Sequence, residues 1–442
     1  MSQQLALLGG SKTVPNNPTD IFDWPIVGPE DEKAVLEVLH NGAMSGIDIT
    51  KQFENEFARW QGLTYALGFN TGTASLHAAM FGCKVGVGDE IIAPSLTYWA
   101  TALPAFSLGA TILFADVETT SLCIDPADIE RKISPHTKAI VVVHYLGHPA
   151  DMSRIMDVAD RHRIPVIEDV SHAHGGLYKG KRVGVFGKAA AMSLMSGKSL
   201  PVGEAGILAT NDQELYERAM AFGHYGRYNA QIQTEDLKGY TGLPLGGYKY
   251  RMHQMSSALG RVQLANYDNR MHEIDRAMNY FWDQLDGVPG IQAHRTPPGT
   301  DSTMGGWYAA RGKYVPEDLG GLSVTRFCEA VTAEGCVISP GANKPLHIHP
   351  LFTTCDVYGH GRPTRMAHAQ RDIIAAQGSL PVTEQIGTRL YSIPWFKHFR
   401  PAEIDLYADA FKKVAEGFQE LLPGDRGNNS SVGGWHFFKP DA

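Results

Sequence analysis

The chain has 442 residues, of which 43% are hydrophobic and 19% charged, and its formal net charge is −8. This composition is typical of a globular protein with one large or two ordinary domains, and it excludes a disordered chain. The acidic balance and the lack of a long basic run argue against nucleic-acid or anionic-membrane binding as the main role.

The five cysteines are scattered and form no C-x-x-C pair, so the sequence predicts neither a disulfide framework nor a zinc site. No run of 18 or more apolar residues is present, and we expect no membrane span. Leu5-Ala-Leu-Leu8 is too short for a secretory core and has no basic residue before it. These features predict a protein of the reducing cytoplasm.

The first residues, 1–25, are predicted to form an extended N-terminal arm. Pro29 and the three acids after it predict the start of a helix, because proline and carboxylates favour a first helical turn. The spacing of Phe53, Phe57 and Trp60 predicts a second helix. We interpret that aromatic stripe as part of the core and not as a cofactor-binding surface.

Short apolar strands then alternate with helical patterns as far as residue 210. The expected strands are 64–69, 90–93, 111–115, 139–143, 165–168, 189–193 and 206–210. The expected helices between them are 76–81, 98–108, 126–133 and 152–161. This alternation predicts an α/β domain over residues 26–255, with a mostly parallel sheet covered on both faces.

The remaining chain predicts a smaller α+β domain over residues 256–422. Residues 225–250 are rich in Gly and Tyr and are interpreted as a long functional loop. A helix at 252–285 is expected to link the domains, followed by strands at 307–313 and 390–393 and by helices at 324–334 and 402–422. Residues 423–442 are expected to form a tail that docks on a partner subunit through Trp435, Phe437 and Phe438.

Lys198 lies among small residues, between two apolar segments, with no other charge until Glu204. Loss of solvation lowers the pKa of an amine and makes it more nucleophilic, as a Schiff-base lysine requires. Because most lysines are exposed, a surface loop is the alternative interpretation of this residue taken alone.

Asn70-Thr-Gly-Thr-Ala-Ser75 lies between a predicted strand and a predicted helix. Backbone N–H groups and the helix dipole favour an anion there, Gly72 allows close approach, and Thr73 adds a hydroxyl. The pattern suits a phosphate but lacks the lysine of a Walker loop and the glycines of a dinucleotide fold. An ordinary helix N-cap is the alternative.

Two further predicted strands end in candidate ligand groups. Tyr98 follows the strand 90–93 and could stack on a flat ring, with plain packing as the alternative. Asp169 lies just after the strand 165–168, where open α/β sheets place ligand groups, and His172 follows three residues later. A carboxylate at this place could hold a ring nitrogen protonated, with a helix N-cap as the alternative.

A phosphate cradle, a stacking aromatic, a strand-end acid and a lysine therefore occur in order on one α/β stretch. Pyridoxal 5′-phosphate needs all four, because the protein must hold its phosphate, ring face, ring nitrogen and aldehyde. Together these features predict this cofactor more specifically than any one of them does.

From about residue 5 to residue 420, the sequence resembles the DegT group of sugar and cyclitol aminotransferases within the fold-type I pyridoxal phosphate enzymes. The resemblance implies a large domain with a seven-stranded type of sheet between helices and a smaller C-terminal domain. It also implies that Gly72, Thr73 and Ser193 bind the phosphate and that Lys198 carries the cofactor. Ala205 replaces a glycine that usually follows in the family.

The same resemblance implies that Tyr98 stacks on the ring, Asp169 pairs with the pyridine nitrogen and His172 lies against the cofactor. Gly247-Tyr-Lys-Tyr-Arg-Met252 resembles a loop that reaches the neighbouring subunit's site, which implies a homodimer with shared active sites. Lys249 stands where the family usually has Asn, and either the phosphate or an acidic substrate is its expected ligand. Arg251 is expected to bind substrate.

Three short segments resemble the branch that acts on scyllo-inosose and related ketocyclitols, generally with L-glutamine as donor: residues 5–10, 223–227 and 345–350. His347 and His349 in the last segment have no partner spaced like a metal site, and no metal ligands are predicted. L-Glutamine or L-glutamate is the expected donor and a ketocyclitol the expected acceptor, in cyclitol or amino sugar biosynthesis of the aminoglycoside type.

The expected reaction is a ping-pong transamination. Lys198 would release the cofactor to the donor and then move the proton, and Asp169 would keep the ring nitrogen protonated. A nucleotide-linked keto-sugar aminotransferase and a non-catalytic sensor of the same fold are the alternatives. A dehydratase fits less well, because deoxygenating members commonly have histidine in place of this lysine.

Overall fold

A computed structural model describes residues 4–15, 20–224, 232–357, 359, 373–429 and 432 of the chain. Within these residues the largest sheet has seven strands in the order β1-β9-β8-β5-β4-β2-β3. β9 runs opposite to the other six strands of this sheet, which confirms the mostly parallel sheet. The strands are β1 (Tyr65–Phe69), β2 (Glu90–Pro94), β3 (Thr111–Ala115), β4 (Thr137–Val143), β5 (Val166–Asp169), β8 (Ala189–Ser193) and β9 (Gly206–Thr210).

Helices cover both faces of this sheet, as the near-continuous burial of its strands requires. Alternate side chains of each strand point to opposite faces, so Ile91 and Ile92 belong to different core clusters. One face packs against α3 (Gly72–Gly82), α4 (Pro104–Ser107) and α7 (Gln213–Gly223). The other face packs against α2 (Asp48–Gln61), α5 (Pro126–Lys132) and α6 (Met152–His162).

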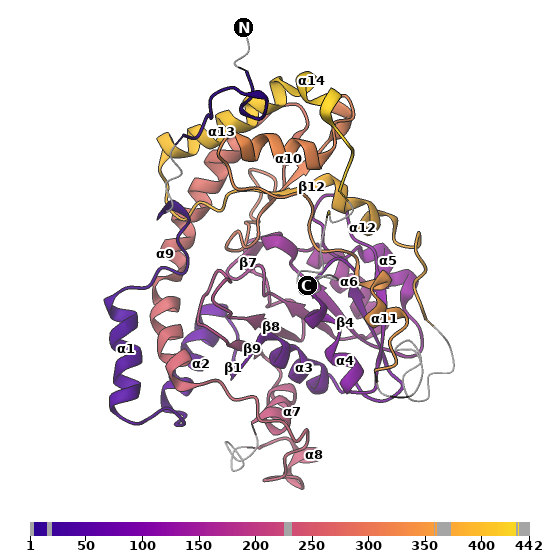
Figure 1. Cartoon of the computed structure of the whole chain (residues 1–442). Helices are drawn as coiled ribbons and strands as arrows, with labels where there is room; N and C mark the ends of the chain where they lie inside the picture. Colours follow the sequence, from indigo (N-terminus) through magenta and orange to yellow (C-terminus); the bar gives the residue numbers. More distant parts are fainter. Residues whose placement is uncertain are drawn as a thin grey trace.

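The longest described helix, α9 (Gln254–Gln284), joins the sheet region to the C-terminal part of the chain (Figure 1). Its 31 residues span about 46 Å. The first half packs against α1 (Pro29–His40) and α2, and the second half packs against α13 (Pro401–Glu416). The helix is continuous across residue 255, and the domain division at that residue stays a prediction.

The C-terminal part combines a small antiparallel sheet with helices around a second core. Its strands are β10 (Ile291–Ala293), β11 (Arg311–Tyr314) and β12 (Leu390–Ser392). Its main helices are α10 (Val324–Ala333), α13 and α14 (Phe418–Leu421). Leu5 from the N-terminal arm is buried in this core, and Glu334 accepts hydrogen bonds from the backbone of Ala6 and Thr13. The arm therefore packs on the C-terminal part.

The shorter elements lie mainly at the turns between these layers. They are β6 (Leu177–Tyr178), β7 (Lys181–Arg182), α8 (Glu235–Lys238), α11 (Pro350–Thr353), α12 (Pro381–Gln385) and the 3-10 turns Ala6–Leu8, Asp20–Phe22, Trp99–Thr101, Tyr145–Gly147, Pro316–Leu319, Leu346–Ile348, Ile386–Arg389 and Leu422–Gly424.

Three sequence predictions need correction. The helix expected at 98–108 is a 3-10 turn followed by the single-turn α4, because Pro104 has no N–H to continue a helical ladder. The strand expected at 307–313 begins only at Arg311, because Trp307 and Ala309 adopt the left-handed conformation. The helix expected at 402–422 starts one residue earlier and breaks at Gly417, where α13 gives way to α14.

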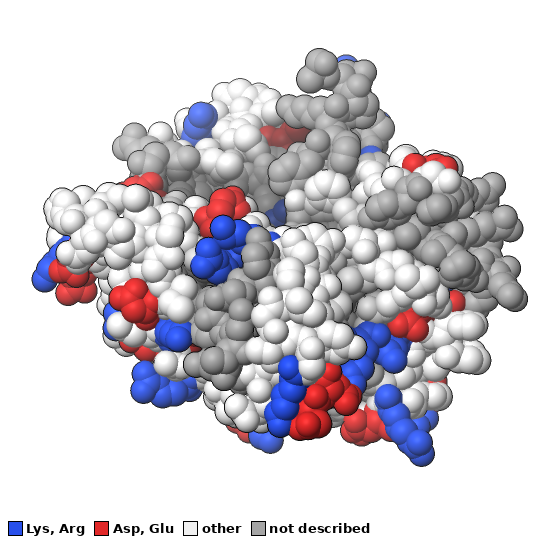
Figure 2. All heavy atoms as spheres, turned by 90° about the horizontal axis from the view of Figure 1, so that it is seen from below, with Lys and Arg blue, Asp and Glu red and all other residues white. Residues whose placement is uncertain are grey.

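The face of the molecule in Figure 2 gives no sign of a dominant charge. Seen from below, Lys and Arg side chains are interspersed with Asp and Glu side chains (Figure 2). Among the described residues, no helix is both long enough and apolar enough to cross a membrane.

Candidate active site

The predicted site residues gather at one edge of the large sheet. Strands β1, β5 and β8 run in the same direction, so their carboxyl ends lie at the same edge. The chain leaves β1 into Gly72, ends β5 at Asp169 and leaves β8 into the turn that holds Lys198. This is where open α/β sheets bind ligands.

Lys198 is buried, so its interpretation as a surface-loop lysine is wrong. Its side chain lies above the Tyr308 ring, with Nζ 3.9 Å from the ring centroid, and the residue is 8% exposed. Burial lowers the pKa of Lys198 from 10.5 to about 8, although the nearby Asp169 carboxylate opposes this effect. The Trp24 indole N–H donates to the Lys198 carbonyl over 2.9 Å and anchors the turn.

Asp169 is the last residue of β5 and is 4% exposed. Its Oδ2 accepts a hydrogen bond from Thr101 Oγ1 at 2.8 Å, and its Oδ1 accepts one from the Ser171 N–H at 3.1 Å. The chain continues from Asp169 into turns and not into a helix, so the helix N-cap interpretation is wrong. The carboxylate is instead held in place at the sheet edge, beside Lys198.

The segment that precedes α3 meets the end of β8. Thr71 caps α3, with its Oγ1 accepting from the Ala74 N–H at 3.0 Å, so the ordinary N-cap interpretation of the segment also holds. A β-carbon on Gly72 would lie 2.6 Å from Ser193 Cβ, which explains why this position needs glycine. Thr73 is exposed in the first turn of the helix. Gly72 and Ser193, predicted separately, are therefore adjacent at a helix N-terminus suited to an anion.

His172 lies beside Lys198 on the aromatic side of the site. Its ring centroid is 4.7 Å from that of Tyr308 and 5.6 Å from that of Tyr145. Burial, reinforced by the Lys198 charge, lowers the pKa of His172 well below its usual range. The imidazole is therefore neutral at physiological pH and packs as a flat ring.

Tyr98 occupies the turn between β2 and α4 and is 37% exposed. Its ring makes an edge contact with Trp99, with centroids 5.8 Å apart. Thr101 in the same turn is the residue that donates to Asp169, so this turn connects the tyrosine to the strand-end acid. Stacking of Tyr98 on a cofactor ring stays a prediction.

Lys249 and Arg251 lie at the β1 edge of their own chain. Phe69 pairs with Arg251 in an antiparallel bridge, and the Asn70 N–H donates to the Tyr250 carbonyl over 2.8 Å. Lys249 is exposed and Arg251 partly buried. Their reach into a neighbouring subunit stays a prediction.

Parts of three sequence predictions lie outside the described residues. They are the end of the segment 223–227, the start of the loop 225–250 and the aromatic positions 435, 437 and 438 of the tail. The short segments 5–10 and 345–350 are described, and the second of them contacts the large sheet. In it His347 bonds Ser95 Oγ at 2.7 Å and Glu384 Oε1 at 3.0 Å, which fixes the segment against β2.

The sequence did not reveal the aromatic wall beside Lys198. Tyr308 lies between two residues with positive φ, in a stretch whose pattern resembled a strand. The Trp395 ring centroid is 6.3 Å from that of Tyr308 and 5.3 Å from that of Trp24. These three aromatics come from residues 24, 308 and 395, and no local spacing in the sequence connects them.

The residues present fit pyridoxal 5′-phosphate. The N-terminus of α3, where Gly72 leaves room beside Ser193, suits the phosphate. The buried carboxylate of Asp169, held by two hydrogen bonds, suits a protonated ring nitrogen. Lys198, with its lowered pKa, suits the aldehyde. No group of three or more His, Cys, Asp or Glu side chains able to hold a metal occurs among the described residues.

Comparisons with known proteins agree with this geometry. Residues 25–412 match the model of the DegT/DnrJ/EryC1/StrS aminotransferase family. The L-glutamine:2-deoxy-scyllo-inosose aminotransferase of Streptoalloteichus tenebrarius is 33% identical over 83% of this chain and 88% of its own length. The dTDP-3-amino-3,4,6-trideoxy-alpha-D-glucose transaminase of Streptomyces venezuelae is 30% identical over 88% of this chain and 92% of its own.

A solved structure shows the same fold. The aminotransferase from Psychrobacter cryohalolentis superposes with a TM-score of 0.79 at 28% identity, over 90% of this chain and 99% of that chain. The chain belongs to the DegT/DnrJ/EryC1/StrS family and is a pyridoxal phosphate-dependent aminotransferase of fold type I, with a buried lysine, an acid and a helix N-terminus suited to an anion at one edge of its sheet.

Proposed function

We propose that the protein transfers an amino group from L-glutamine or L-glutamate to a ketocyclitol similar to scyllo-inosose. The observation that carries this proposal is the 33% identity to an L-glutamine:2-deoxy-scyllo-inosose aminotransferase over 88% of that protein. It fits the buried lysine and acid, since donor and acceptor would react in turn at one site. The donor would leave as a 2-oxo acid before the ketone enters.

In this mechanism the bound cofactor supplies an electron sink for the carbanion that forms when the donor loses its Cα proton. Lys198 would take that proton from Cα and release it at C4′ of the cofactor. With a pKa of about 8, about a tenth of its amines are unprotonated at pH 7, against fewer than about one in a thousand at 10.5. Asp169 holds a proton at the ring nitrogen, and its two hydrogen bonds keep it oriented.

The aromatic wall of Trp24, Tyr308 and Trp395 is proposed to face the acceptor ring. Aromatic faces suit the C–H groups of a cyclitol and exclude water from the reacting carbon. Each of the three rings is only partly buried in this chain, so part of its surface remains available for contact.

A homodimer with shared sites is part of the proposal. Two apolar side chains of α1 are exposed in the single chain, Leu36 at 47% and Leu39 at 43%, and Val27 just before the helix is 53% exposed. Exposed large apolar side chains of this kind are consistent with a subunit interface. The loop that ends in Arg251 would then lie at the boundary between subunits.

A nucleotide-linked keto-sugar is the second candidate acceptor. The supporting observation is the 30% identity to a dTDP-linked sugar transaminase over 92% of that protein. Both candidates use the same lysine and acid, so only the acceptor separates them.

The test is a panel of acceptors, namely scyllo-inosose, 2-deoxy-scyllo-inosose and a dTDP-linked 3-keto sugar, each with L-glutamine and L-glutamate. Amino product is expected from a ketocyclitol, and Lys198→Ala protein should form none. Faster turnover of the nucleotide-linked sugar would replace the first proposal by the second. Cofactor binding with no turnover of any acceptor would contradict both.

A further inference from the structure

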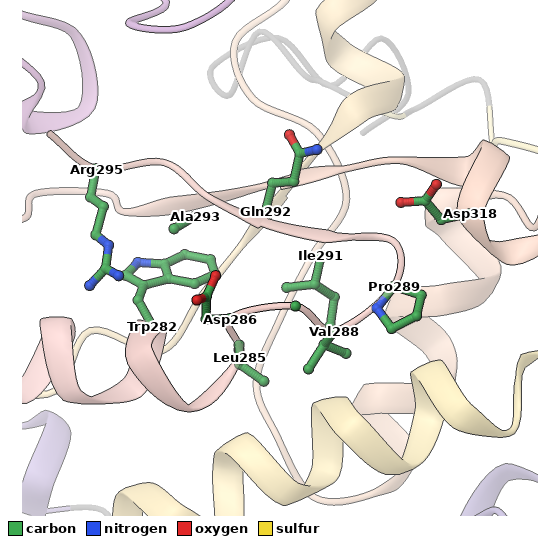
Figure 3. A pocket seen from close by; sticks show the side chains of 11 residues that line it. Trp282, Leu285, Asp286, Val288, Pro289, Ile291, Gln292, Ala293, Arg295 and Asp318 are labelled. Carbon is green, nitrogen blue, oxygen red and sulfur yellow. The ribbon is translucent and has the colours of Figure 1, made fainter. Parts of the chain in front are cut away.

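Buried or partly buried arginines in this structure usually have a carboxylate partner. Arg261 pairs with Glu56 at 2.8 Å, and Arg295 pairs with Asp283 at the same distance. Figure 3 shows Arg295 at one end of a pocket of about 590 Å³ between α9 and β10, where its guanidinium lies beside the Trp282 indole. Because Arg295 already has its acid, this pocket offers no unpaired arginine to an anionic ligand.

Arg311, the first residue of β11, has no such partner. Its Nε donates to the Gly341 carbonyl at 3.0 Å, and its Nη1 donates to the carbonyls of Ala309 and Ala310 at 2.9 and 3.2 Å. Within the described ranges no carboxylate pairs with it, and neither N–H of Nη2 has a hydrogen-bond partner. Burial nevertheless lowers the pKa of Arg311, although part of the side chain remains accessible.

An arginine in this state is costly, because a buried charge is normally paired with an opposite charge. Neutral carbonyls satisfy three of its five N–H groups. The remaining two sit on one nitrogen, Nη2, and Arg311 as a residue is partly accessible. The missing partner is therefore an acceptor that comes from outside the described chain.

Arg311 lies next to the reacting centre. Its charge acts on Tyr308 and on His172, and these two rings also flank Lys198. It acts on Tyr145 as well, whose hydroxyl donates to Asn343 Oδ1 at 2.7 Å. Arg311 Nη1 also donates to the carbonyl of Ala309, the residue after Tyr308, so Arg311 is anchored close to the ring that contacts Lys198.

We propose that Arg311 binds the α-carboxylate of the amino donor. This inference rests on the proposed function and deepens it. A carboxylate is the group that the amino acid and its 2-oxo acid product share and that a cyclitol lacks. In a site that must accept both substrates in turn, one cation therefore recognises the donor without a matching contact to the acceptor.

Binding of the cofactor phosphate and a purely structural role are less consistent with the contacts of Arg311 than binding of the donor carboxylate. The phosphate has its own place at Gly72 and Ser193, at the N-terminus of α3. Besides Lys198, a second buried lysine lies near the aromatic wall: Lys397 donates to the Trp395 carbonyl at 2.9 Å, and its Nζ lies 3.5 Å from the centre of that indole. Its amine is therefore already engaged by Trp395. A purely structural Arg311 would hold Gly341 and would not distinguish one donor from another.

The test uses cofactor-loaded protein and follows each half-reaction by absorbance. Arg311→Gln should raise the KM for L-glutamine by about 30-fold or more, because removing one side of a buried charged contact has an effect of that size. Arg311→Lys should have a smaller effect, since it keeps the charge without the planar fork. The second half-reaction, with the ketone, should change by less than about threefold.

The deciding readout is the preference for L-glutamine over 4-aminobutanamide, which is glutamine without its α-carboxylate. The unmodified protein should prefer L-glutamine, and Arg311→Gln should lose most of that preference. Lys313→Gln is the matched control, because Lys313 lies two residues along the same strand and donates to the Thr120 carbonyl. It should leave the preference unchanged.

Equal losses in both half-reactions, or an unchanged preference in Arg311→Gln, would overturn the inference. The donor half-reaction does not need the acceptor, so a wrong acceptor leaves this test intact. If Arg311→Gln does not fold, Arg311→Lys is measured in its place. If the unmodified protein reacts with no amino acid, its binding of 2-oxoglutarate is measured by calorimetry and compared with that of Arg311→Lys. Equal binding by the two proteins would refute the proposed role of Arg311 in holding the carboxylate.

Discussion

Replacing Lys198 by Met should stabilise the cofactor-free protein while abolishing its activity. Burial lowers the lysine's pKa from 10.5 to about 8, so the folded state disfavours the charged amine. Each pKa unit corresponds to about 1.4 kcal/mol, which gives a cost of about 3 kcal/mol below pH 8. The contact of Nζ with the Tyr308 ring offsets about 0.5–2 kcal/mol of it. We expect Lys198→Met to raise the free energy of unfolding at pH 7 by about 1–3 kcal/mol.

The pH dependence follows from the same shift. The folded pKa lies below the unfolded one, so between pH 8 and pH 10.5 the unfolded chain binds more protons and stability rises with pH. Above this window the lysine is neutral in both states and the cost disappears. The advantage of Lys198→Met should therefore be largest below pH 8 and should fall below about 1 kcal/mol near pH 10.5.

Urea unfolding of cofactor-free protein at pH 7 and pH 10.5 measures this difference. Lys12→Met is the control, because Lys12 is exposed and its replacement should change stability by no more than about 0.5 kcal/mol. A variant at position 198 that is less stable than the unmodified protein at pH 7, or whose advantage does not depend on pH, would show that burial does not destabilise the charged lysine.

Other predictions concern the cofactor and the assembly. Asp169→Asn should lower turnover by about 100-fold or more but cofactor affinity by less than about tenfold, as steady-state kinetics and a binding titration would show; near-normal turnover would refute its role. Gly72→Ala should weaken cofactor binding by about tenfold or more, because its methyl group meets the end of β8, whereas Gly86→Ala, with open space around it, should not. Equal cofactor affinities in the two variants would contradict the assignment of Gly72 to the phosphate site. Mixing inactive Lys198→Ala and inactive Arg251→Ala subunits should restore some activity if sites are shared. Both must first be shown to fold and exchange subunits, and no recovery would then count against shared sites.

The sequence by itself determined the sheet and much of the site. Runs such as Ile140–Val143 are apolar and β-branched, so they predict buried strands, and the helices between them imply parallel order. Parallel order brings strand ends to one edge, which is why Gly72, Asp169 and Lys198 could be grouped before their positions were known. These predictions succeed because apolar periodicity and the alternation of strands with helices can be read from short stretches of sequence.

Only the tertiary structure decided which distant residues complete the site. Tyr308 approaches Lys198 because left-handed residues on either side turn the chain, which a pattern of apolar residues does not reveal. Arg311 resembles any strand arginine in the sequence, and its lack of an acid partner becomes visible only once its surroundings are packed. The lowered pKa of Lys198 has the same origin, because desolvation depends on the whole set of neighbours that folding brings around a charge.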